Sequence, residues 1–560
     1  MQYDLSSTTR ALHDTPDTFT RSKTSGNQPA QFLTKKQQII VTIICCFLLF
    51  VPLVSQAYPA TFVVDTLLDN ENDGCGVNAC TLREAIVDAN TLPGFDNIEF
   101  TPGLSGTIVL AGSHIVISSA MTINGPGASE LAVSGNNLSR VFLVSGTSAN
   151  AVVGGLTITD GLATLVTIGI NLITDGGAIL NVNGGTVSIL NCHISNSSAG
   201  GFGGGIATVS VLPLLATSTT NIYNSSIFGN SATLGGGGVS NLGVDVGLTG
   251  LLTGADTTIA NSTITSNSAL AEGGGLSNTG GHLNLTNTTI SHNSSVAAGG
   301  GLINVAGIVT GFVFMRNAIL AENEALVLGT LISDDGLGIV NSLGNNLIGN
   351  NLNISASFAA SVFIGGIPQP NINGDLVGSI SIGTQIINPD LGSLQDNGGP
   401  THTRALIFSS PAINQGANCV ATDTCVPNPN GSNPPFALGN DQRGPGFVRL
   451  FNGVVDIGAY EYQIPYTATV VTVKGKVLKA DGTPVRNAVV SMTNSFGDVR
   501  AVRTNGFGRF SFGQVETGES YLISAYHKAY SFASRLVEIR SDTNDIVLVA
   551  DGGSGAKSTK

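Results

Sequence analysis

Apolar and polar residues alternate along short segments through most of the chain, most regularly between residues 186 and 320. The alternation returns there in recurring units, each built around an Asn followed three residues later by an apolar residue, usually Ile, with a run of glycines further on. A period of two is typical of a β-strand with one face turned inward. The units therefore predict many short strands and tight corners.

The recurring Asn fixes the spacing of these units. It stands at Asn191, Asn224, Asn261, Asn287 and Asn317, so successive units are 33, 37, 26 and 30 residues apart. Helical repeats keep a constant period, whereas a coil of short strands lets its loops lengthen. Gly and Asn supply the positive φ angles needed at corners, and stacked Asn residues are expected to bond one another's amides. These features predict an all-β fold with a right-handed parallel β-helix over residues 101–390. The alternative, a β-sandwich of hairpins, does not require the recurrence.

Both ends of such a coil need cover, because an open rung exposes backbone edges. We expect residues 61–100 to form an N-terminal cap that includes a short helix. The apolar face of that helix would carry Leu82, Ala85, Ile86 and Ala89. Residues 391–462 are expected to form the C-terminal cap.

A linker at residues 463–467 is expected to separate the coil from a second domain. Residues 468–550 regain Lys and Arg and alternate again, which predicts a small β-sandwich. Residues 551–560 are predicted to be a disordered tail.

The N-terminal 57 residues have the order of a secretory signal. Lys35 and Lys36 precede an apolar run, and Ser55-Gln56-Ala57 is a small-x-small cleavage pattern. The run is shorter than the roughly 20 residues of a membrane span. We predict a cleaved signal peptide, with an uncleaved anchor as the alternative and as the chain's one link to a membrane.

Five cysteines follow this segment. The close pairs Cys75/Cys80 and Cys419/Cys425 are expected to form disulfides in an oxidising compartment. Zinc is the rival, but no companion Cys/His cluster has the spacing of metal ligands. Cys192 is expected to pack as a small apolar residue.

Charge narrows the classes of partner. The formal net charge is −13. Between residues 61 and 400 there is no Lys, and Arg83, Arg140 and Arg316 are the only arginines. Nucleic acid and anionic lipid attract clustered cations, so neither is an expected partner.

Four segments carry family resemblances. The run CTLREAI at residues 80–86 resembles the CSLREA motif of bacterial secreted β-helix proteins, with Thr81 in place of Ser. The Gly-rich and Asn-x-x-Ile units resemble polymorphic outer-membrane-protein repeats. Residues 397–416 and 441–461 resemble the tail of choice-of-anchor β-helix proteins, although Asn414-Gln-Gly stands where that family usually has Asp-Ala-Gly. Residues 468–550 resemble the carboxypeptidase regulatory-like domain, a transthyretin-like or Ig-like sandwich, which implies a non-catalytic accessory module.

The chain offers few candidates for catalysis. Parallel β-helices include pectate lyases, which need a basic residue beside acids, and polygalacturonases, which need several acids. Asp334-Asp335 is the one paired acid, and we expect it to serve a turn. His193, His282 and His292 are expected to be solvent-facing strand residues, and His402 and Arg404 to orient the cap. We therefore assign no catalytic residue and no cofactor.

Calcium is a weaker possibility. Asp390, Asp396, Asp441 and Asp456 gather in the predicted C-terminal cap, and calcium binds oxygen ligands. Acids that hydrogen-bond exposed backbone would explain the same pattern.

The leading functional hypothesis is an exported, non-enzymatic protein of the bacterial surface or envelope that binds extracellular glycans or proteins, as an adhesin does. The alternative is a pectate-lyase-like enzyme acting on polysaccharide. A groove with three or more converging acids, or with a base beside one, would favour the enzyme. A lateral face poor in acids would favour binding.

Overall fold

The computed structural model describes residues 59–69, 74–76, 79–163, 166–168, 171–210, 216–243, 254–305, 311–380, 385–426, 437–463, 471–494, 499–515, 519–539 and 543–550. The predicted signal segment, the tail and most of the linker lie outside these ranges. Within them the chain is almost entirely β, as predicted, and its longest sheets are parallel.

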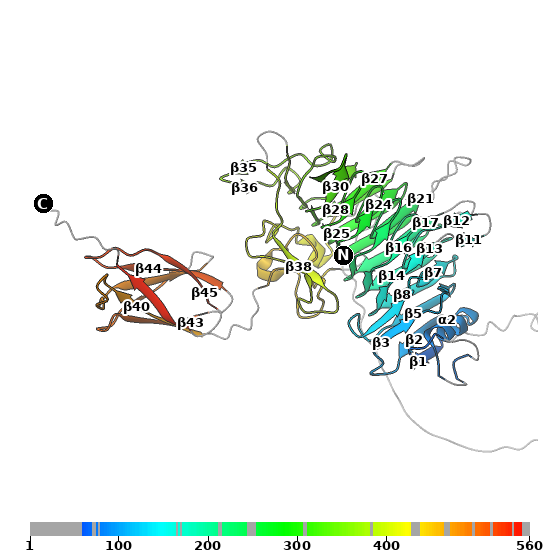
Figure 1. Ribbon diagram of the computed structural model, residues 1–560, viewed down its shortest axis with the longest axis horizontal. Helices are drawn as coiled ribbons and strands as arrows, with labels where there is room; N and C mark the ends of the chain where they lie inside the picture. The colour runs from blue at the N-terminus through cyan, green and yellow to red at the C-terminus, as the bar shows by residue number, and fades with distance from the viewer. Residues whose placement is uncertain are drawn as a thin grey trace, which may run out of the picture. The chain divides into compact units, whose positions relative to one another are not determined.

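The strands of the β-helix form four parallel stacks, and Figure 1 shows the strands of successive rungs side by side along the coil. Stack 1 contains β1 (Thr61–Val64), β2 (Phe95–Phe100), β5 (Ala120–Asn124), β8 (Asn150–Gly154), β14 (Thr186–Leu190), β18 (Thr219–Tyr223), the first halves of β22 (Asp256–Thr265) and β25 (His282–Ser291), β28 (Phe312–Arg316) and β33 (Asn341–Ser342). Stack 2 contains β3 (Gly106–Val109), β6 (Leu131–Ser134), β9 (Thr157–Thr159), β15 (His193–Ser195), β19 (Ser226–Phe228), the second halves of β22 and β25, β29 (Ile319–Ala321), β34 (Leu347–Ile348) and β37 (Leu376–Val377).

The other two stacks close the coil. Stack 3 contains β10 (Leu162–Ala163), β16 (Ser198–Ala199), β20 (Ser231–Ala232), β23 (Ser268–Ala269), β26 (Ser294–Ser295) and β30 (Glu324–Val327). Stack 4 contains β4 (Ile115–Ile117), β7 (Phe142–Ser145), β13 (Ile179–Val182), β17 (Ile206–Ser210), β21 (Val239–Gly243), β24 (Leu276–Thr279), β27 (Leu302–Val305) and β32 (Gly336–Gly338). Three antiparallel hairpins join β11 (Val166–Ile168) to β12 (Asn171–Ile173), β30 to β31 (Thr330–Ser333), and β35 (Phe363–Ile364) to β36 (Ile367–Pro368).

The variable spacing of the repeats arises at one corner of the coil. Between stack 4 and stack 1 the chain inserts residues 211–218 after β17 and residues 244–255 after β21, but only residues 280–281 after β24. Within the units from Asn191 to Asn293 the other corners stay nearly constant, because they are packed against the rungs above and below. Gly204, for example, leaves no room for a Cβ, which would lie 2.2 Å from the Ser231 carbonyl oxygen.

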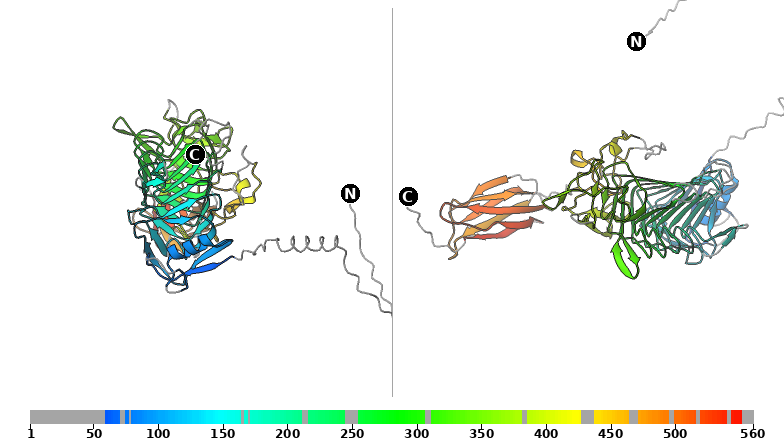
Figure 2. Two further views of the ribbon diagram at one scale, coloured as in Figure 1. Left: turned by 90° about the vertical axis from the view of Figure 1, so that its right-hand side faces the viewer. Right: turned by 90° about the horizontal axis from the view of Figure 1, so that it is seen from above.

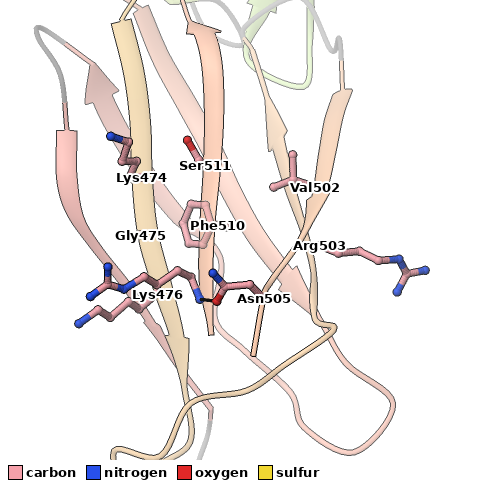
Figure 3. A pocket seen from close by; sticks show the side chains of 9 residues that line it. Lys474, Gly475, Lys476, Val502, Arg503, Asn505, Phe510 and Ser511 are labelled. Carbon is pink, nitrogen blue, oxygen red and sulfur yellow. Dashed lines mark hydrogen bonds between the residues drawn. The ribbon is translucent and has the colours of Figure 1, made fainter. Parts of the chain in front are cut away.

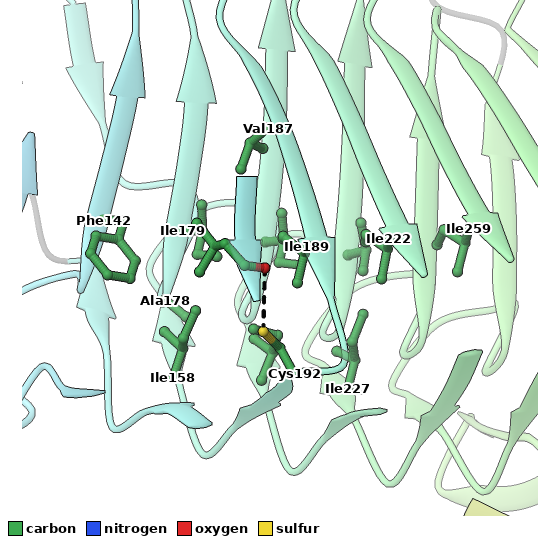
Figure 4. Close-up of a cluster of buried hydrophobic side chains, with 14 of the residues drawn as sticks. Phe142, Ile158, Ala178, Ile179, Val187, Ile189, Cys192, Ile222, Ile227 and Ile259 are labelled. Carbon is green, nitrogen blue, oxygen red and sulfur yellow. Dashed lines mark hydrogen bonds between the residues drawn. The ribbon is translucent and has the colours of Figure 1, made fainter. Parts of the chain in front are cut away.

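Inward-facing aliphatic side chains form one continuous core along the coil (Figure 4). Ile189, Ile222 and Ile259 lie in register on neighbouring strands and are fully buried. Complete burial of such a side chain contributes roughly 1.5–3 kcal/mol, so the stacking of rungs supplies the core that one rung lacks. Cys192 lies in the same core, where burial raises its pKa to about 11, and it packs as predicted.

Buried asparagines form amide ladders, as expected for equivalent Asn residues on stacked rungs, and one ladder runs through the second Asn of the units. The Nδ2 atoms of Asn230, Asn267 and Asn293 each donate to the Oδ1 atom of the next member at 3.0 Å, and the last acceptor is Asn323. Each of these lies six residues after a recurring Asn. The recurring asparagines themselves all have positive φ, between 47° and 53°, which confirms the predicted corners. A left-handed backbone at the corner leaves their side chains outside the ladder.

The helix α2 (Leu82–Thr91) covers the N-terminal end of the coil. Its four predicted apolar residues are fully buried. Thr81 caps it, accepting from the Glu84 amide while the Glu84 side chain accepts from the Thr81 amide. The Cys75–Cys80 disulfide precedes this cap, and Arg83 makes a bidentate pair with Asp69 at 2.8 Å.

The segment predicted as a C-terminal cap runs along the side of the coil as well as at its end (Figures 1 and 2). We call residues 397–462 the lateral segment. Before and within it lie β38 (Leu391–Gln395), β39 (Thr403–Leu406), the short helix α3 (Cys419–Thr422) and the 3-10 turn η1 (Phe451–Gly453). The Cys419–Cys425 disulfide, as predicted, ties α3 to the residues after it.

The C-terminal domain is a sandwich of two sheets. One contains β43 (Arg509–Val515), β40 (Val471–Leu478) and β46 (Thr543–Val549), and the other contains β42 (Val499–Arg503), β41 (Val489–Thr493), β44 (Glu519–Tyr526) and β45 (Arg535–Ile539). Alternate residues of β40 are buried, as the period of two predicts. They pack into a separate core with Phe510, Phe512 and Ile523.

Candidate functional site

The recurring asparagines bind the lateral segment. Asn261 Nδ2 donates to the Asn440 carbonyl at 2.8 Å, and Asn317 Oδ1 accepts from the Ala417 amide at 2.8 Å. One contact, at 3.3 Å from Asn317 to Asn287, joins two recurring asparagines directly. At Asn261, Asn287 and Asn317 the residue that turns the corner of the rung therefore also holds a second layer against the coil.

A cluster of five buried ionisable residues fastens the middle of this layer. Arg449 is fully buried and donates to Asn261 Oδ1 at 2.6 Å and to the Gly458 and Ala459 carbonyls. Its guanidinium lies 3.8 Å from the Glu461 carboxylate. Burial raises the pKa of Glu461, and the neighbouring Asp456 raises it further. The remaining members, Asp441 and Arg443, pair at 2.6 Å.

Only two of the four acids considered for calcium meet in this cluster. Asp441 accepts from Arg443 and from the Glu461 amide, and Asp456 accepts from the Asn414 and Tyr462 amides. Asp390 and Asp396 lie elsewhere, accepting from Ser409 and Gly398. Across the described residues no three His, Cys, Asp or Glu side chains are arranged as metal ligands.

The paired acids Asp334 and Asp335 are buried and structural. Asp335 ends the amide ladder, accepting from the Asn323 amide and side chain on one oxygen and from the Asn350 amide on the other. In an amide ladder each side chain donates to the next one, so the group that follows the last Asn is offered only N–H donors. A carboxylate suits this position because both of its oxygens accept hydrogen bonds. Burial raises the pKa of Asp335 to about 7. Asp375 accepts from the amide and the side chain of a single buried Asn, Asn346, in the same geometry.

The expectation that His193 faces solvent is wrong. The residue is 7% exposed beneath His402, whose backbone amide donates to His193 Nε2 at 3.0 Å. Burial, followed by repulsion from His402, lowers the pKa of His193 to about 4. The ring is therefore a neutral acceptor that holds the lateral segment. That His402 and Arg404 orient this segment stays a prediction.

A half-exposed polar surface remains on the outward side of stack 1, and we call it the lateral face. Two columns of outward residues form it. One column contains Thr186, Thr219, Asp256, His282 and Phe312, and the other contains Ser188, Asn221 and Thr258, beyond which Asn284 and Phe314 of the same column are buried. The third outward column, which includes Leu190, Tyr223 and Ala260, packs against the lateral segment. The face is thus bordered on one side by a second layer of chain.

Its most distinctive chemistry lies where three rungs meet. His282 Nδ1 is 2.9 Å from Asp256 Oδ1, and both side chains are more than a third exposed. The His282 ring lies 5.6 Å from that of Phe312, which is 39% exposed and stacks on Phe314 at 6.2 Å. A carboxylate, an imidazole and an apolar ring therefore stand side by side on an open surface.

The residues next to Asp256, His282 and Phe312 in the sequence do not indicate that the three side chains meet, but their positions within the repeat do. Asp256, His282 and Phe312 each lie five residues before a recurring Asn. Aligning the units on that Asn would have placed the three side chains in one column. The same alignment places His292 and Glu322 in another, at five residues after it, where their side chains lie 3.3 Å apart.

The three arginines of the coil serve the fold. Arg83 binds Asp69, the side chain of Arg140 donates to the Asp175 carbonyl at 3.0 Å, and that of Arg316 donates to the Val426 carbonyl at 3.0 Å. Arg140 is 1% exposed. None stands beside Asp256 in the register of stack 1, so the lateral face has no arginine base next to its acid.

Comparison with known proteins assigns one region. No curated protein matches the chain. Among the described residues no helix is both long and apolar enough to cross a membrane. Residues 472–550 match the carboxypeptidase regulatory-like domain, so the C-terminal sandwich is a domain of that kind.

Proposed function

We propose that this protein is an exported, non-enzymatic component of a bacterial surface or envelope, and that it binds neutral or weakly charged glycans through the lateral face. The observation that carries this proposal is the column of Asp256, His282 and Phe312 on an open polar surface. Sugar hydroxyl groups pair with carboxylate, imidazole, amide and hydroxyl side chains. The apolar faces of sugar rings pack on aromatic rings such as Phe312.

The acids of the coil support binding over catalysis. Glycoside hydrolysis uses two carboxyl groups that flank the scissile bond. Asp256 is the one acid in the two columns of the lateral face, and Asp334, Asp335 and Asp375 are fully buried. A pectate-lyase-like enzyme is the outcome to be tested against.

Export and family membership belong to the same proposal. The cleavage pattern at Ser55-Gln56-Ala57 and the two disulfides support an extracytoplasmic location. The α2 cap, with its Cys75–Cys80 disulfide, supports membership of the CSLREA and choice-of-anchor type. Nucleic acid stays outside the proposal because the coil has so few cations.

Affinity electrophoresis of the full chain in a panel of neutral polysaccharides tests the lateral face. Phe312→Ala is expected to weaken binding at least about tenfold, because truncation of a buried aromatic contact removes a large share of affinity. Phe408→Ala changes a 71% exposed ring outside the face and is the matched control. Equal retardation of the two variants contradicts the proposed site, and release of reducing or unsaturated ends contradicts the non-enzymatic role.

Histidine variants sharpen the assignment. His282→Ala removes the partner of Asp256 on the lateral face, whereas His292→Ala removes a comparably exposed partner of Glu322 away from it. We expect the first to lower affinity and the second to leave it unchanged. Cell fractionation with mass spectrometry of the mature N-terminus tests export independently, and the expected first residue is Tyr58.

A further inference from the structure

The C-terminal sandwich concentrates the positive charge that the coil lacks. Residues 472–550 contain ten Lys and Arg against seven Asp and Glu, whereas the whole stretch from residue 61 to residue 400 contains three arginines. The net charge of this domain is therefore positive, whereas the net charge of the whole chain is −13. Such local excess points to anionic partners.

Three of these cations stand together in the register of two strands. Lys476 of β40 lies directly opposite Arg509 of β43, and Lys474 lies two residues away on the same exposed side of β40. Like charges directly opposite each other destabilise a strand pair. Among the described residues none makes an ion pair with any of the three. Within the described part of the sandwich, this repulsive arrangement therefore stands without a counter-charge from a neighbouring side chain.

A cavity of about 700 Å³ opens beside this group (Figure 3). Lys474, Lys476 and Arg509 line it together with polar Asn505 and Ser511. The Arg509 amide donates to Asn505 Oδ1 at 3.0 Å, so the turn fixes the Asn side chain at the rim. Figure 3 also shows Arg503 pointing away from the others. The cavity therefore offers three cations and fixed polar groups in one concave site.

We propose that this cavity binds the carboxylate or sulfate groups of an acidic polysaccharide. A concave site is suited to a saccharide unit, and Asn505 and Ser511 supply partners for its hydroxyl groups next to its charge. Single-stranded nucleic acid would need exposed aromatic rings for base stacking, and Phe510 in the cavity is 4% exposed. The site is separate from the lateral face and does not depend on it.

The test measures binding of the full chain by titration calorimetry to polygalacturonate, dextran sulfate, neutral dextran and phosphatidylglycerol vesicles. The variant Lys476→Gln/Arg509→Gln keeps uncharged side chains at exposed positions, and Lys528→Gln/Arg535→Gln removes two exposed cations that do not line the cavity. Affinity for at least one acidic polysaccharide is expected to fall about tenfold or more in the first variant and to stay unchanged in the second. High salt is expected to weaken binding in the native chain.

Several results would overturn the proposal. Equal losses in both variants would show general charge attraction, and binding to vesicles without binding to either polysaccharide would identify a lipid site. Lack of binding to both acidic polysaccharides would leave no ligand of the proposed class. Phe312→Ala is expected to retain acidic polysaccharide binding, which separates this site from the lateral face.

Discussion

The coil and the C-terminal sandwich treat polar groups in opposite ways. The coil buries rows of neutral amides, such as Asn230, Asn267 and Asn293, inside its wall. The sandwich buries apolar residues almost alone and sets its charges on the surface. A repeated rung places identical side chains above one another, and identical amides attract because each is both donor and acceptor. Identical charges would repel, which explains why a coil of stacked repeats avoids them.

Charge enters the coil mainly where the repeat ends or meets another layer. Asp335 stands at the end of an amide ladder, and Asp375 accepts from Asn346 near the end of the coil. Arg83 lies in the N-terminal cap, and Arg449 lies beneath the lateral segment. In the sandwich, by contrast, Lys476 and Arg509 face each other without a partner among the described residues. The difference suggests that coil charges are structural and that sandwich charges serve a ligand.

The buried arginine gives the largest expected effect. Arg449→Ala leaves Glu461 and Asp456 buried without their cation, which typically costs about 3–5 kcal/mol. Hydrogen exchange of residues 437–463 is expected to rise sharply as the lateral segment loosens. Arg503→Ala, on the exposed surface of the sandwich, is expected to change local stability by less than about 0.5 kcal/mol. If the two variants show similar protection from hydrogen exchange in residues 437–463, Arg449 is no more important to the fold than a surface arginine.

Acid is expected to release the other end of the lateral segment. The folded pKa of His193 is about 4, below its ordinary 6.5. The unfolded state therefore binds the proton first, and stability falls as pH drops from about 6.5 to about 4. The loss reaches about 3 kcal/mol at low pH, since one pKa unit is about 1.4 kcal/mol. Proteolysis between residues 397 and 410 at pH 4 and pH 7 measures it.

A glutamine variant isolates the contribution of this ring. His193→Gln keeps a side-chain acceptor for the His402 amide but does not titrate in this range. Its cleavage is expected to be the same at both pH values after correction for protease activity. If the acid sensitivity persists in that variant, another group controls the segment.

The amide ladder gives the next effect. Asn267→Ala removes the acceptor of the buried Asn230 backbone amide and breaks the side-chain contacts to Asn230 and Asn293, and a buried unpaired group costs about 1–3 kcal/mol. We expect a loss of about 2 kcal/mol in urea denaturation of the coil. Asn221→Ala is the control, because that outward amide makes a single 3.4 Å contact and its loss is expected to be near zero. Equal losses would mean that the ladder adds no stability beyond ordinary surface contacts.

Much of the coil could be predicted from local pattern. The period of two, the glycine runs and the apolar face of α2 each depend on a few neighbouring residues, and the structure confirms all three. The disulfides also follow from close spacing. The expected amide ladder also follows from the repeat. Two columns of Asn recur with the same period, however, and only the φ angle of each corner shows which of them forms the ladder.

The lateral contacts had no such local signal. His193 and His402 are 209 residues apart, and Asn261 and Arg449 are 188 apart. The residues next to either partner in the sequence do not indicate that a later segment runs back along the coil after the last rung. Burial of His193 follows from that return, so its exposure was predicted wrongly. The Asp256–His282 pair is intermediate in how far it could be predicted. An alignment of the repeats places the two residues in one column, whereas their neighbours in the sequence give no sign of the contact.

The smallest expected effect is a gain in stability, whereas the other substitutions are expected to lower stability. Arg509→Gln removes the cation opposite Lys476, and relief of the like-charge contact is expected to stabilise the sandwich by about 0.5 kcal/mol. Thermal unfolding in low salt measures it, with Arg535→Gln as the control on another strand. The gain is expected to vanish at high salt, where such repulsion is screened. A stabilising mutation that also abolishes acidic polysaccharide binding is the combination expected of a ligand site, because such a site retains unfavourable charge for its partner. If Arg509→Gln instead destabilises the sandwich, the charge serves the fold, and the contrast between the two domains no longer holds at this position.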